Sequence, residues 1–277
     1  MKKTNEKQGM EKKIMAGKFG ITVLGSGSKG NAAVIHGPEG KLLLDAGFSA
    51  RELENRMEQS EIDPDNIQGI LITHGHSDHI KGCRTFADRH HVPAYLTAPT
   101  LKDADRNHFL PERKTVIAPG SAFELCGITV EPFTLPHDAV DTIGYTFRAV
   151  QKKIGVATDL GHLNMLARQK LRGCALLMLE ANHEPSLLQT SPRPIQLKRR
   201  ILSRHGHLSN EDSLAALEEL LTDDSVSLVL AHLSEECNNR ELLEDMAEKT
   251  LKKLGRTDIF LSIACQDKPL ETFWLDQ

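Results

Sequence analysis

The chain has 277 residues, of which 39% are hydrophobic and 26% charged, and its formal net charge is −4. This apolar content excludes a chain that is disordered throughout, and no apolar run approaches the roughly 18 residues that a membrane-spanning helix needs. The acidic balance excludes binding of nucleic acid by bulk positive charge, so an anionic partner requires a local basic patch or a metal. The 13 histidines outnumber the aromatic residues (nine Phe, two Tyr and one Trp), which indicates a chemical use for imidazole.

The first 17 residues contain several lysines, and no apolar segment follows them before Phe19, so they are predicted to be a disordered tail rather than a signal peptide. Residues 18–277 show no repeat, linker or break in composition and predict one domain. The cysteines are odd in number and form no C-x-x-C pair, which argues against a disulfide framework and a zinc ribbon. We therefore expect a cytoplasmic protein without membrane attachment, and the sequence gives no indication of its oligomeric state.

The first half of the chain alternates short apolar runs with helical segments. Strands are predicted at 21–24, 33–36, 41–45, 67–73 and 94–96. Helices are predicted at 50–59, 78–90 and 101–108.

The second half begins with a β-rich stretch over 115–150, and further strands are predicted at 154–158, 175–180, 226–231, 259–264 and 271–274. Ser209 and Asp212 form a capping box at the start of a helix, and another helix is predicted at 242–254. Because hairpin-like and strand–helix segments occur in both halves, the pattern predicts helices that cover two packed sheets.

A cluster of metal-competent side chains follows the buried strand at 67–73. His74 and His76 are two residues apart in extended chain, so both imidazoles can point the same way. Asp78 and His79 begin the next helix and point elsewhere, where they can serve a second ion. This segment therefore predicts two adjacent metal positions, an arrangement that clamps the attacking and leaving oxygens of a displacement reaction.

The pattern His-x-His-x-Asp-His after a buried strand resembles the signature of the metallo-β-lactamase fold superfamily. Asp45 matches the strand-terminal Asp of that family, which supports the ligand loop by hydrogen bonding. His137, Asp159 and His232 match its remaining ligand positions in order. The resemblance implies an α/β fold of the αββα four-layer sandwich type.

The resemblance also implies the distribution of the ligands. One ion would be held by His74, His76 and His137, and the other by Asp78, His79 and His232, with Asp159 as the bridge. Asp78 is counted among the catalytic groups as well, and His162 is expected to support Asp159. A set of imidazoles and carboxylates without thiolate suits zinc or manganese, with iron as a third candidate. A hydroxide between the two ions would attack phosphorus.

A narrower resemblance is to the YycJ/WalJ group of small bacterial metallohydrolases, which are regarded as nucleases. It rests on the motifs at 25–31, 179–183, 206–210 and 232–238. Glu184 and the segment 192–194 depart from the pattern of the group, which affects the expected substrate contacts rather than the metal ligands. The resemblance implies an exonuclease that acts on DNA, and the short span between Asp159 and His232 leaves no room for a large cap domain over the cleft.

Cleavage of a phosphodiester requires an acid for the leaving alkoxide. His207 is the first candidate, because its glycine-containing loop leads directly into the capped helix. His183 is the second, because the segment 180–183 resembles an acidic-His box of tRNA-processing relatives. Either histidine could instead cap a helix or bond to a ligand carboxylate.

Substrate contacts are expected from two segments. The stretch 185–210 contains no acidic residue, and its basic side chains fit phosphate contacts or an ordinary solvated helix face equally well: Arg193, Lys198, Arg199, Arg200 and Arg204. Of these, Lys198, Arg199 and Arg200 are the candidate substrate residues. The glycine-rich segment 25–31 lacks the spacing of a nucleotide P-loop and is expected to line the cleft. Its candidate substrate residues are Ser26, Ser28 and Asn31, and Asn182 is added from the 179–183 motif.

These observations favour a metal-dependent 5′-to-3′ DNA exonuclease that acts on single strands or ends. Three alternatives stay open: a hydrolase of RNA or a cyclic phosphodiester, a thioesterase or lactonase on the same fold, and a non-catalytic metal-binding regulator. Asp159 argues against a lactam-cleaving enzyme, because those members often carry Cys at this position. The complete ligand set argues against the regulator.

Overall fold

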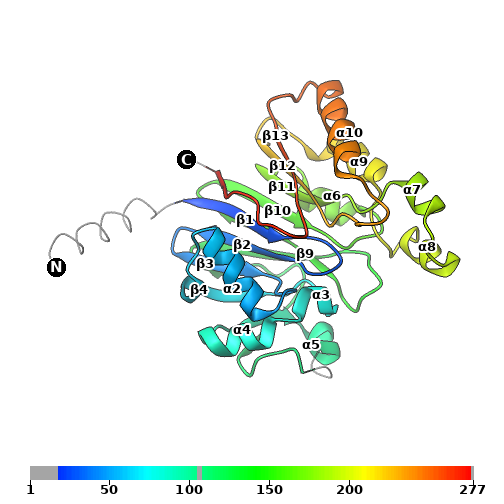
Figure 1. The fold of residues 1–277 in the computed structure, drawn as a ribbon. Coiled ribbons are helices and arrows are strands. Elements are labelled where there is room, and N and C mark those ends of the chain that lie inside the picture. Colours follow the sequence, from blue (N-terminus) through cyan, green and yellow to red (C-terminus); the bar gives the residue numbers. More distant parts are fainter. Residues whose placement is uncertain (1–17, 105–107, 276–277) are drawn as a thin grey trace.

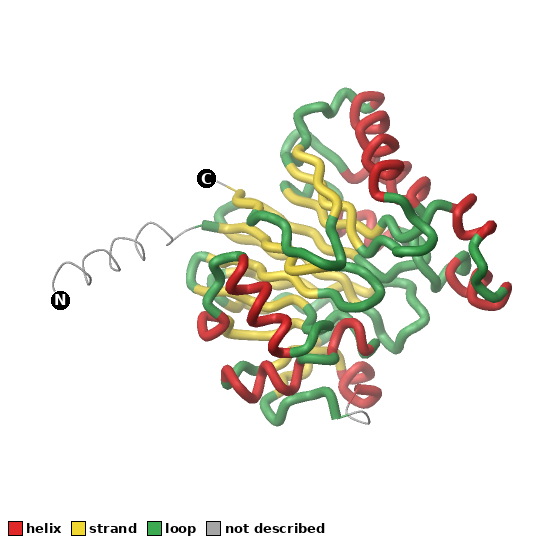
Figure 2. The backbone as a smooth tube through the Cα atoms, in the orientation of Figure 1, coloured by secondary structure: helices red, strands yellow, loops and turns green. Residues whose placement is uncertain are grey.

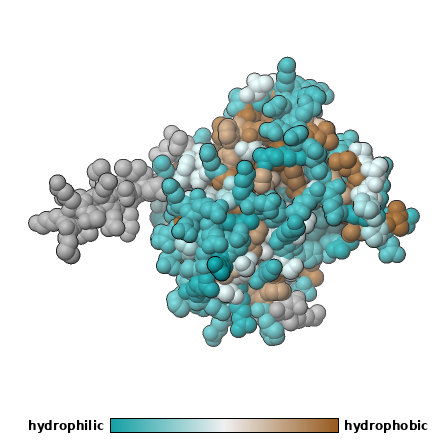
Figure 3. Space-filling model, viewed as in Figure 1, coloured by the Kyte–Doolittle hydropathy of each residue, from teal (hydrophilic) through white to brown (hydrophobic). Residues whose placement is uncertain are grey.

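The computed structural model describes residues 18–104 and 108–275. The predicted tail over residues 1–17 lies outside these ranges. In the described part, no helix has the length and apolarity that crossing a bilayer demands. The face seen in Figure 3 is mostly hydrophilic, with hydrophobic residues scattered among polar ones.

The strands form two seven-stranded sheets (Figures 1 and 2). The first sheet has the order β14-β1-β2-β3-β4-β5-β6, and the second has the order β13-β12-β11-β10-β9-β8-β7. The strands are β1 (Phe19–Gly25), β2 (Ala32–Gly37), β3 (Gly40–Leu44), β4 (Ile67–Leu71), β5 (Ala94–Thr97), β6 (Lys114–Ile117), β7 (Phe123–Leu125), β8 (Ile128–Thr134), β9 (Ile143–Ala149), β10 (Lys152–Ala157), β11 (Leu176–Glu180), β12 (Ser227–Ala231), β13 (Phe260–Ile263) and β14 (Phe273–Leu275).

Helices cover the outer face of each sheet. The helices of the described residues are α2 (Ala50–Gln59), α3 (Ser77–Ile80), α4 (Cys83–His90), α5 (Ala98–Ala104), α6 (Met165–Leu171), α7 (Pro185–Thr190), α8 (Ile195–Ile201), α9 (Asn210–Leu220) and α10 (Arg240–Lys253), with a 3-10 turn η1 at Pro64–Asn66. Helices α2 and α4 lie on the first sheet, and α6, α9 and α10 lie on the second (Figure 1).

Three apolar cores correspond to these layers. The core between the sheets includes Ile21, Leu42 and Tyr145, and the two outer cores lie between each sheet and its helices. Burial of this apolar surface is the main force that holds the layers together. The predicted αββα sandwich is confirmed.

Most predicted elements are present, with two corrections in the first half. The helix expected over 78–90 is two helices, because the chain turns at Gly82, where an added Cβ would lie 2.0 Å from the carbonyl oxygen of Phe48. The helix expected over 101–108 is α5 (Ala98–Ala104), which begins earlier, at Ala98, and residues 105–107 of the prediction lie outside the described ranges. Helices α6, α7 and α8 were not predicted, since each spans only six or seven residues and shows too little periodicity.

The parallel strands place their carboxyl ends at one edge of the molecule. Strand β3 pairs in parallel with β4 in the first sheet, and β11 pairs in parallel with β10 and with β12 in the second. Beside this edge the sheets are tied together, because Tyr145 Oη of β9 donates to the carbonyl oxygen of Ile72 at 2.9 Å. Residues that directly follow these strands therefore meet across the two sheets.

Candidate metal centre

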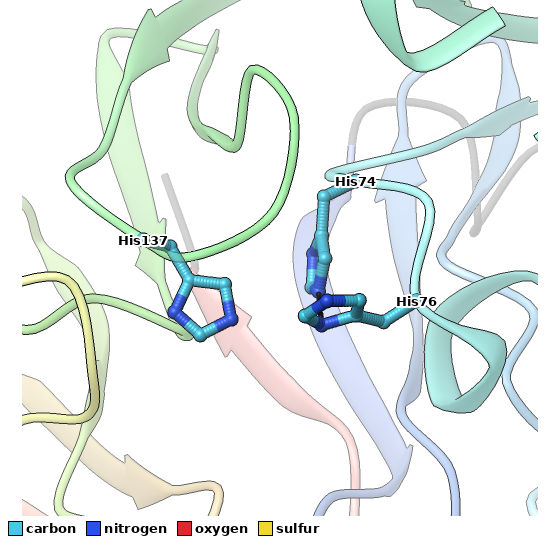
Figure 4. A group of neighbouring side chains, drawn as sticks. All are labelled: His74, His76 and His137. Atoms are coloured by element: carbon cyan, nitrogen blue, oxygen red, sulfur yellow. Dashed lines mark hydrogen bonds between the residues drawn. The ribbon is translucent and has the colours of Figure 1, made fainter. Parts of the chain in front are cut away.

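Three imidazoles meet where the two sheets face each other. His74 follows β4, His76 caps the N-terminus of α3, and His137 lies in the loop after β8. One ring nitrogen of each lies within 4.8 Å of the others, and Figure 4 shows the three rings gathered around one gap. This is the first group of ligands that the sequence predicted.

The second predicted group lies beside it. Asp78 and His79 come from α3 and His232 follows β12, and their ligand atoms also lie within 4.8 Å of one another. Asp159, two residues after β10, lies between the groups, with its two oxygens 3.2 Å from His79 Nε2 and 3.8 Å from His137 Nε2. The structure thus brings all seven expected ligands together.

Hydrogen bonds on the far side of the rings orient the histidines. The Nδ1 atom of His79 lies 2.7 Å from Asp45 Oδ2, that of His137 lies 2.9 Å from the carbonyl oxygen of Gly206, and that of His232 lies 2.8 Å from Glu180 Oε1. These contacts direct each Nε2 toward the cluster. Bonds of this kind fix the tautomer and the ring orientation of metal-binding histidines.

Several buried polar atoms at the centre of the cluster lack a partner. His137 Nε2, His232 Nε2 and Asp159 Oδ2 make no hydrogen bond to any described residue. Because buried polar atoms are nearly always paired, three such atoms aimed at one place fit a bound cation. The mixture of imidazole nitrogens and carboxylate oxygens fits a divalent ion of the zinc or manganese type.

Asp45 ties the ligand loop to the first sheet. Its two carboxylate oxygens accept hydrogen bonds from Thr73 N and Thr73 Oγ1, both at 2.8 Å, in addition to the contact with His79. Asp45, Asp159 and His232 all adopt left-handed backbone conformations, with φ of 57°, 60° and 56°. Such conformations are costly for residues other than glycine and concentrate at functional sites.

The protonation states of Asp159 and of the histidines around it depend on one another. Burial acts to raise the pKa of Asp159, but His232 and His79 outweigh it and hold that pKa well below its usual value. Burial acts to lower the pKa of His79, whereas Asp159 and Asp45 raise it well above the usual value. The Asp159 carboxylate is therefore ionised at neutral pH, which suits a site for a cation.

Glu180 is a site residue that the sequence analysis did not single out. It ends β11 and is fully buried, and its Oε1 accepts from His207 Nδ1 and His232 Nδ1, both at 2.8 Å. Although burial acts to raise it, the pKa of Glu180 falls to about 2 beside His207 and His232. A charged residue at the carboxyl end of a buried parallel strand was the available signal, the same one that marks Asp159.

The two candidate acids differ in their surroundings. His207 is partly exposed, and its ring lies 5.1 Å from that of His137 and 5.2 Å from that of His232. Burial opposes its protonation, but the Glu180 carboxylate raises the pKa of His207 to about 9. His183 is buried, which lowers its pKa to about 4, and its ring nitrogens bond to no described residue. Of these two histidines, only His207 is in the charged, doubly protonated form at neutral pH.

A pocket of about 150 Å³ opens beside His207. Among the candidate substrate residues, Ser28, Asn182 and Arg200 line it. Lys198 and Arg199 do not, and Lys198 Nζ donates to the carbonyl oxygen of Gln189 at 2.6 Å.

Ser26 and Asn31 have structural partners instead. Ser26 Oγ donates to Asn31 Oδ1 at 2.9 Å and accepts from His232 N at 3.0 Å, and both side chains are buried. His162, which was expected to support Asp159, contacts Arg204, with Nδ1 2.9 Å from the carbonyl oxygen of that residue. The structure does not bring its ring to the cluster.

Comparison with known proteins gives similarity over most of the chain. A family model described as "Beta-lactamase superfamily domain" matches residues 41–232. The chain is 34% identical over 237 residues to exodeoxyribonuclease YycJ of Bacillus anthracis, covering 85% of this chain and 90% of the relative. It is 32% identical over 228 residues to exodeoxyribonuclease WalJ of Streptococcus pneumoniae, covering 81% and 85%.

A solved structure shares the architecture. The metallo-β-lactamase fold protein YhfI of Bacillus subtilis aligns with a TM-score of 0.69 at 14% identity, covering 91% of this chain and 99% of that one. At this identity the likeness concerns the fold alone, and it agrees with the two-sheet sandwich described above.

Proposed function

Because this chain belongs to the β-lactamase superfamily, we propose that it is a dinuclear metal-dependent phosphodiesterase that degrades DNA from its 5′ end. It is a metal-dependent hydrolase, and the proposal concerns the number of ions, the substrate and the roles of individual residues. The relatives named exodeoxyribonuclease support DNA as the substrate.

The observation that carries the proposal is the pairing of two ligand groups with one adjacent acid. The first group is His74, His76 and His137, the second is Asp78, His79 and His232, and Asp159 lies between them. When bound, two divalent ions at these groups would supply a deprotonated water near neutral pH and offset the charge of a phosphodiester. We expect the ions to be zinc or manganese.

The residues of the chain then have distinct tasks. The strand-end loops hold the imidazoles and carboxylates in fixed positions, through Asp45, Glu180 and the backbone of Gly206. Glu180 accepts the Nδ1 proton of His207 and keeps the ring protonated, which leaves the proton on Nε2 for the leaving oxygen. A positioned general acid of this kind contributes typically about 100- to 10,000-fold to the rate.

The test offers the protein several substrates at once. Manganese- or zinc-loaded protein is incubated with 5′-labelled single-stranded DNA, the same sequence as RNA, bis(p-nitrophenyl) phosphate and a glutathione thioester. We expect early release of the label as a mononucleotide from DNA. Thioester turnover without cleavage of nucleic acid would overturn the proposal in favour of a thioesterase. Preferred cleavage of RNA would show that the substrate is RNA rather than DNA.

A variant that lacks metal ligands tests whether the nuclease activity belongs to this protein or to a contaminating one. The double substitution His74→Ala and His76→Ala removes two of the three imidazoles in Figure 4. The purified variant should lose both bound metal and DNA cleavage in parallel. A variant that keeps its nuclease activity would show that the activity belongs to another protein in the preparation.

A further inference from the structure

The glycine-rich loop of residues 26–31 joins β1 to β2 at the edge where the metal ligands meet, and its two end residues are buried rather than facing the cleft. These ends are locked to each other, because Asn31 Oδ1 accepts from Ser26 Oγ at 2.9 Å and from Gly27 N at 3.0 Å. Asn31 Nδ2 in turn donates to the carbonyl oxygen of Gly27 at 3.0 Å. Since a backbone N–H only donates, the bond from Gly27 N fixes which way the amide of Asn31 points.

Each residue of the second ligand group contacts Ser26 or Asn31. Ser26 Oγ accepts from His232 N at 3.0 Å, so the loop of the first sheet bonds to a strand end of the second. Asn31 N donates to the carbonyl oxygen of Asp78 at 2.8 Å, and Asn31 Nδ2 lies 3.0 Å from His79 Nε2. The loop therefore bridges the two segments that carry Asp78, His79 and His232.

The bond from His232 N matters because the backbone of His232 is strained. Its φ of 56° lies in the left-handed region, which costs free energy for a residue other than glycine and persists where surrounding contacts hold it. Ser26 holds the backbone N–H, and Glu180 Oε1 lies 2.8 Å from Nδ1 of the ring. Without the Ser26 hydroxyl this buried N–H would lose its partner, and the backbone would be free to relax away from the geometry that aims Nε2 at the cluster.

The first ligand group has other supports. His74 Nδ1 lies 3.1 Å from Thr73 Oγ1, and His137 Nδ1 lies 2.9 Å from the carbonyl oxygen of Gly206. In the described part of the chain, no hydrogen bond joins residues 26–31 to His74, His76 or His137. A defect in the loop should therefore affect one ion position and spare the other.

Gln266, which follows β13, holds the middle of the same loop. Its buried side chain accepts from Lys29 N at 2.7 Å through Oε1 and donates to the carbonyl oxygen of Gly30 at 3.0 Å through Nε2. Its own carbonyl oxygen accepts from Arg56 Nη1 of α2 at 2.8 Å. A Cβ at Gly27 would lie 2.6 Å from Gln266 Oε1, so the loop needs glycine to close on this side chain. The position of the loop is therefore set by a segment far along the chain.

We propose that Ser26 and Asn31 are positioning residues for the second ion alone, and that Gln266 keeps them in place. They act through the residues that they contact, which are the ligands Asp78, His79 and His232. This inference rests on the proposed two-ion centre and adds what makes its two positions unequal. It also gives a task to the two buried polar residues of the loop.

The test measures metal affinity and uses no enzyme activity. Metal-free protein is titrated with zinc in a calorimeter, and native mass spectrometry counts the bound ions. The unmodified protein should bind two. Ser26→Ala and Asn31→Ala should each weaken one of them by about 10- to 100-fold, the usual loss when a group that supports a metal ligand is removed, and leave the other unchanged. Gln266→Leu, which keeps the size of the side chain but removes both contacts with the loop, should weaken the same ion.

Two further variants identify the ion and control for the loss of a buried hydroxyl. Ser225→Ala removes a hydroxyl that is also buried and also accepts from a backbone N–H, that of Thr222 at 3.1 Å. It lies before β12, at the opposite end of the strand from His232, and should leave both affinities unchanged. His76→Ala should weaken the ion that Ser26→Ala spares, because His76 belongs to the first group.

The outcomes separate this inference from the proposed function. Equal weakening of both ions by Ser26→Ala, or a similar loss in Ser225→Ala, would overturn the positioning role. If Ser26→Ala binds both ions as tightly as the unmodified protein does, the two-ion centre stands and only this inference falls. A single ion in the unmodified protein would remove the two-ion centre and this inference with it. If one ion is weakened selectively but the unmodified protein cleaves no DNA, the positioning role stands and the nuclease falls.

Discussion

His207 and Glu180 form a unit in which each side chain sets the state of the other. The carboxylate keeps the imidazole protonated, and the imidazole keeps the buried carboxylate ionised. Glu180 Oε2 also accepts from Leu160 N at 2.9 Å and Leu208 N at 3.2 Å, which fixes its position between two loops. Four hydrogen bonds thus hold the buried Glu180 carboxylate in one position and keep it charged. The His207 ring that it bonds is held in a fixed place and charge state, as a proton donor requires.

Substitution of His207 by Gln tests its role through the leaving group. We expect cleavage of DNA to fall by about 100- to 10,000-fold, because the alkoxide leaves without a proton. Hydrolysis of bis(p-nitrophenyl) phosphate should change little, since p-nitrophenolate leaves readily as an anion. Steady-state rates on both substrates, with metal content measured alongside, provide the comparison. A similar loss on both substrates would assign His207 to metal binding or folding instead.

Buried His36 predicts a dependence of stability on pH. It lies in β2, its Nε2 is 2.7 Å from Thr22 Oγ1, and burial together with the nearby Lys41 lowers its pKa to about 3. Between pH 6.5 and 3 the unfolded chain binds a proton at this residue and the folded chain does not. The free energy of unfolding should therefore fall by about 1.4 kcal/mol per pH unit as the pH drops through this window.

The matched variant for this effect is His36→Gln, which can still bond to Thr22. Urea unfolding of both proteins between pH 7 and pH 4 gives the difference in slope. The variant should lose less stability on acidification, because the residue that takes up the proton is gone. Identical slopes would mean that His36 is protonated in the folded protein as well.

At the scale of elements, the site is built from the residues that directly follow strands. Asp45 follows β3, Asp159 lies two residues after β10, and His232 follows β12. The sequence predicted these strands and their polar ends, because buried parallel strands appear as continuous apolar runs. The strand pattern by itself did not predict the contacts among them, which the family resemblance implied, since which strand ends meet is decided by sheet pairing between residues far apart in the chain.

The same limit applies to the side chains that were expected to contact substrate. Ser26 and Asn31 were expected to face the cleft, whereas they bond to each other and to the backbone at His232. Arg193 lines the pocket and belongs to the basic stretch 185–210 that the sequence indicated, but the sequence did not tell which basic side chains of that stretch face the pocket. Local patterns predict elements and strand ends, and the direction of a loop side chain depends on neighbours that only the fold supplies.

Gly47 lies where the loop after β3 closely approaches the first turn of α3. A Cβ at this position would lie 1.7 Å from the carbonyl oxygen of Asp78 and 2.6 Å from Asn31 N. Gly47→Ala should therefore displace the first turn of α3, which carries Asp78 and His79. We expect bound metal, measured by elemental analysis, to fall well below that of the unmodified protein, together with a lower melting temperature.

Gly40→Ala serves as the control for that substitution. A Cβ there meets the end of the exposed Gln68 side chain, which can move. Metal content and melting temperature should stay close to those of the unmodified protein. If both glycine variants keep their metal, the tight approach at Gly47 has no bearing on the ligands.

At the scale of the molecule, the ligands come from both sheets. His74, His76, Asp78 and His79 follow β4 of the first sheet, and His137, Asp159 and His232 follow strands of the second. Ions bound between them would link the two halves at one edge. The opposite edge has no such link among the described residues, and apolar packing holds the sheets together there.

Removal of metal should therefore lower the stability of the whole molecule. Ligand at a concentration 100-fold above its Kd stabilises a protein by about 2.7 kcal/mol. For a chain of this size the melting temperature should fall by roughly 5–10 °C when EDTA is added, and return when zinc or manganese is restored. The His74→Ala, His76→Ala double variant should show a much smaller response in differential scanning calorimetry. An unchanged melting temperature of the unmodified protein would contradict a link between the sheets.

The pairing of β1 with β14 has a consequence for synthesis on the ribosome. Phe19 lies opposite Leu275, so the first strand of the described chain completes its sheet with the last one. While the polypeptide emerges, β1 has only β2 beside it, and its other edge keeps unpaired N–H and C=O groups until β14 has been synthesised. Exposed strand edges recruit other chains. A nascent chain of this protein therefore exposes one edge of β1 for as long as the residues between β1 and β14 are being made, and slow translation of that stretch would prolong the exposure.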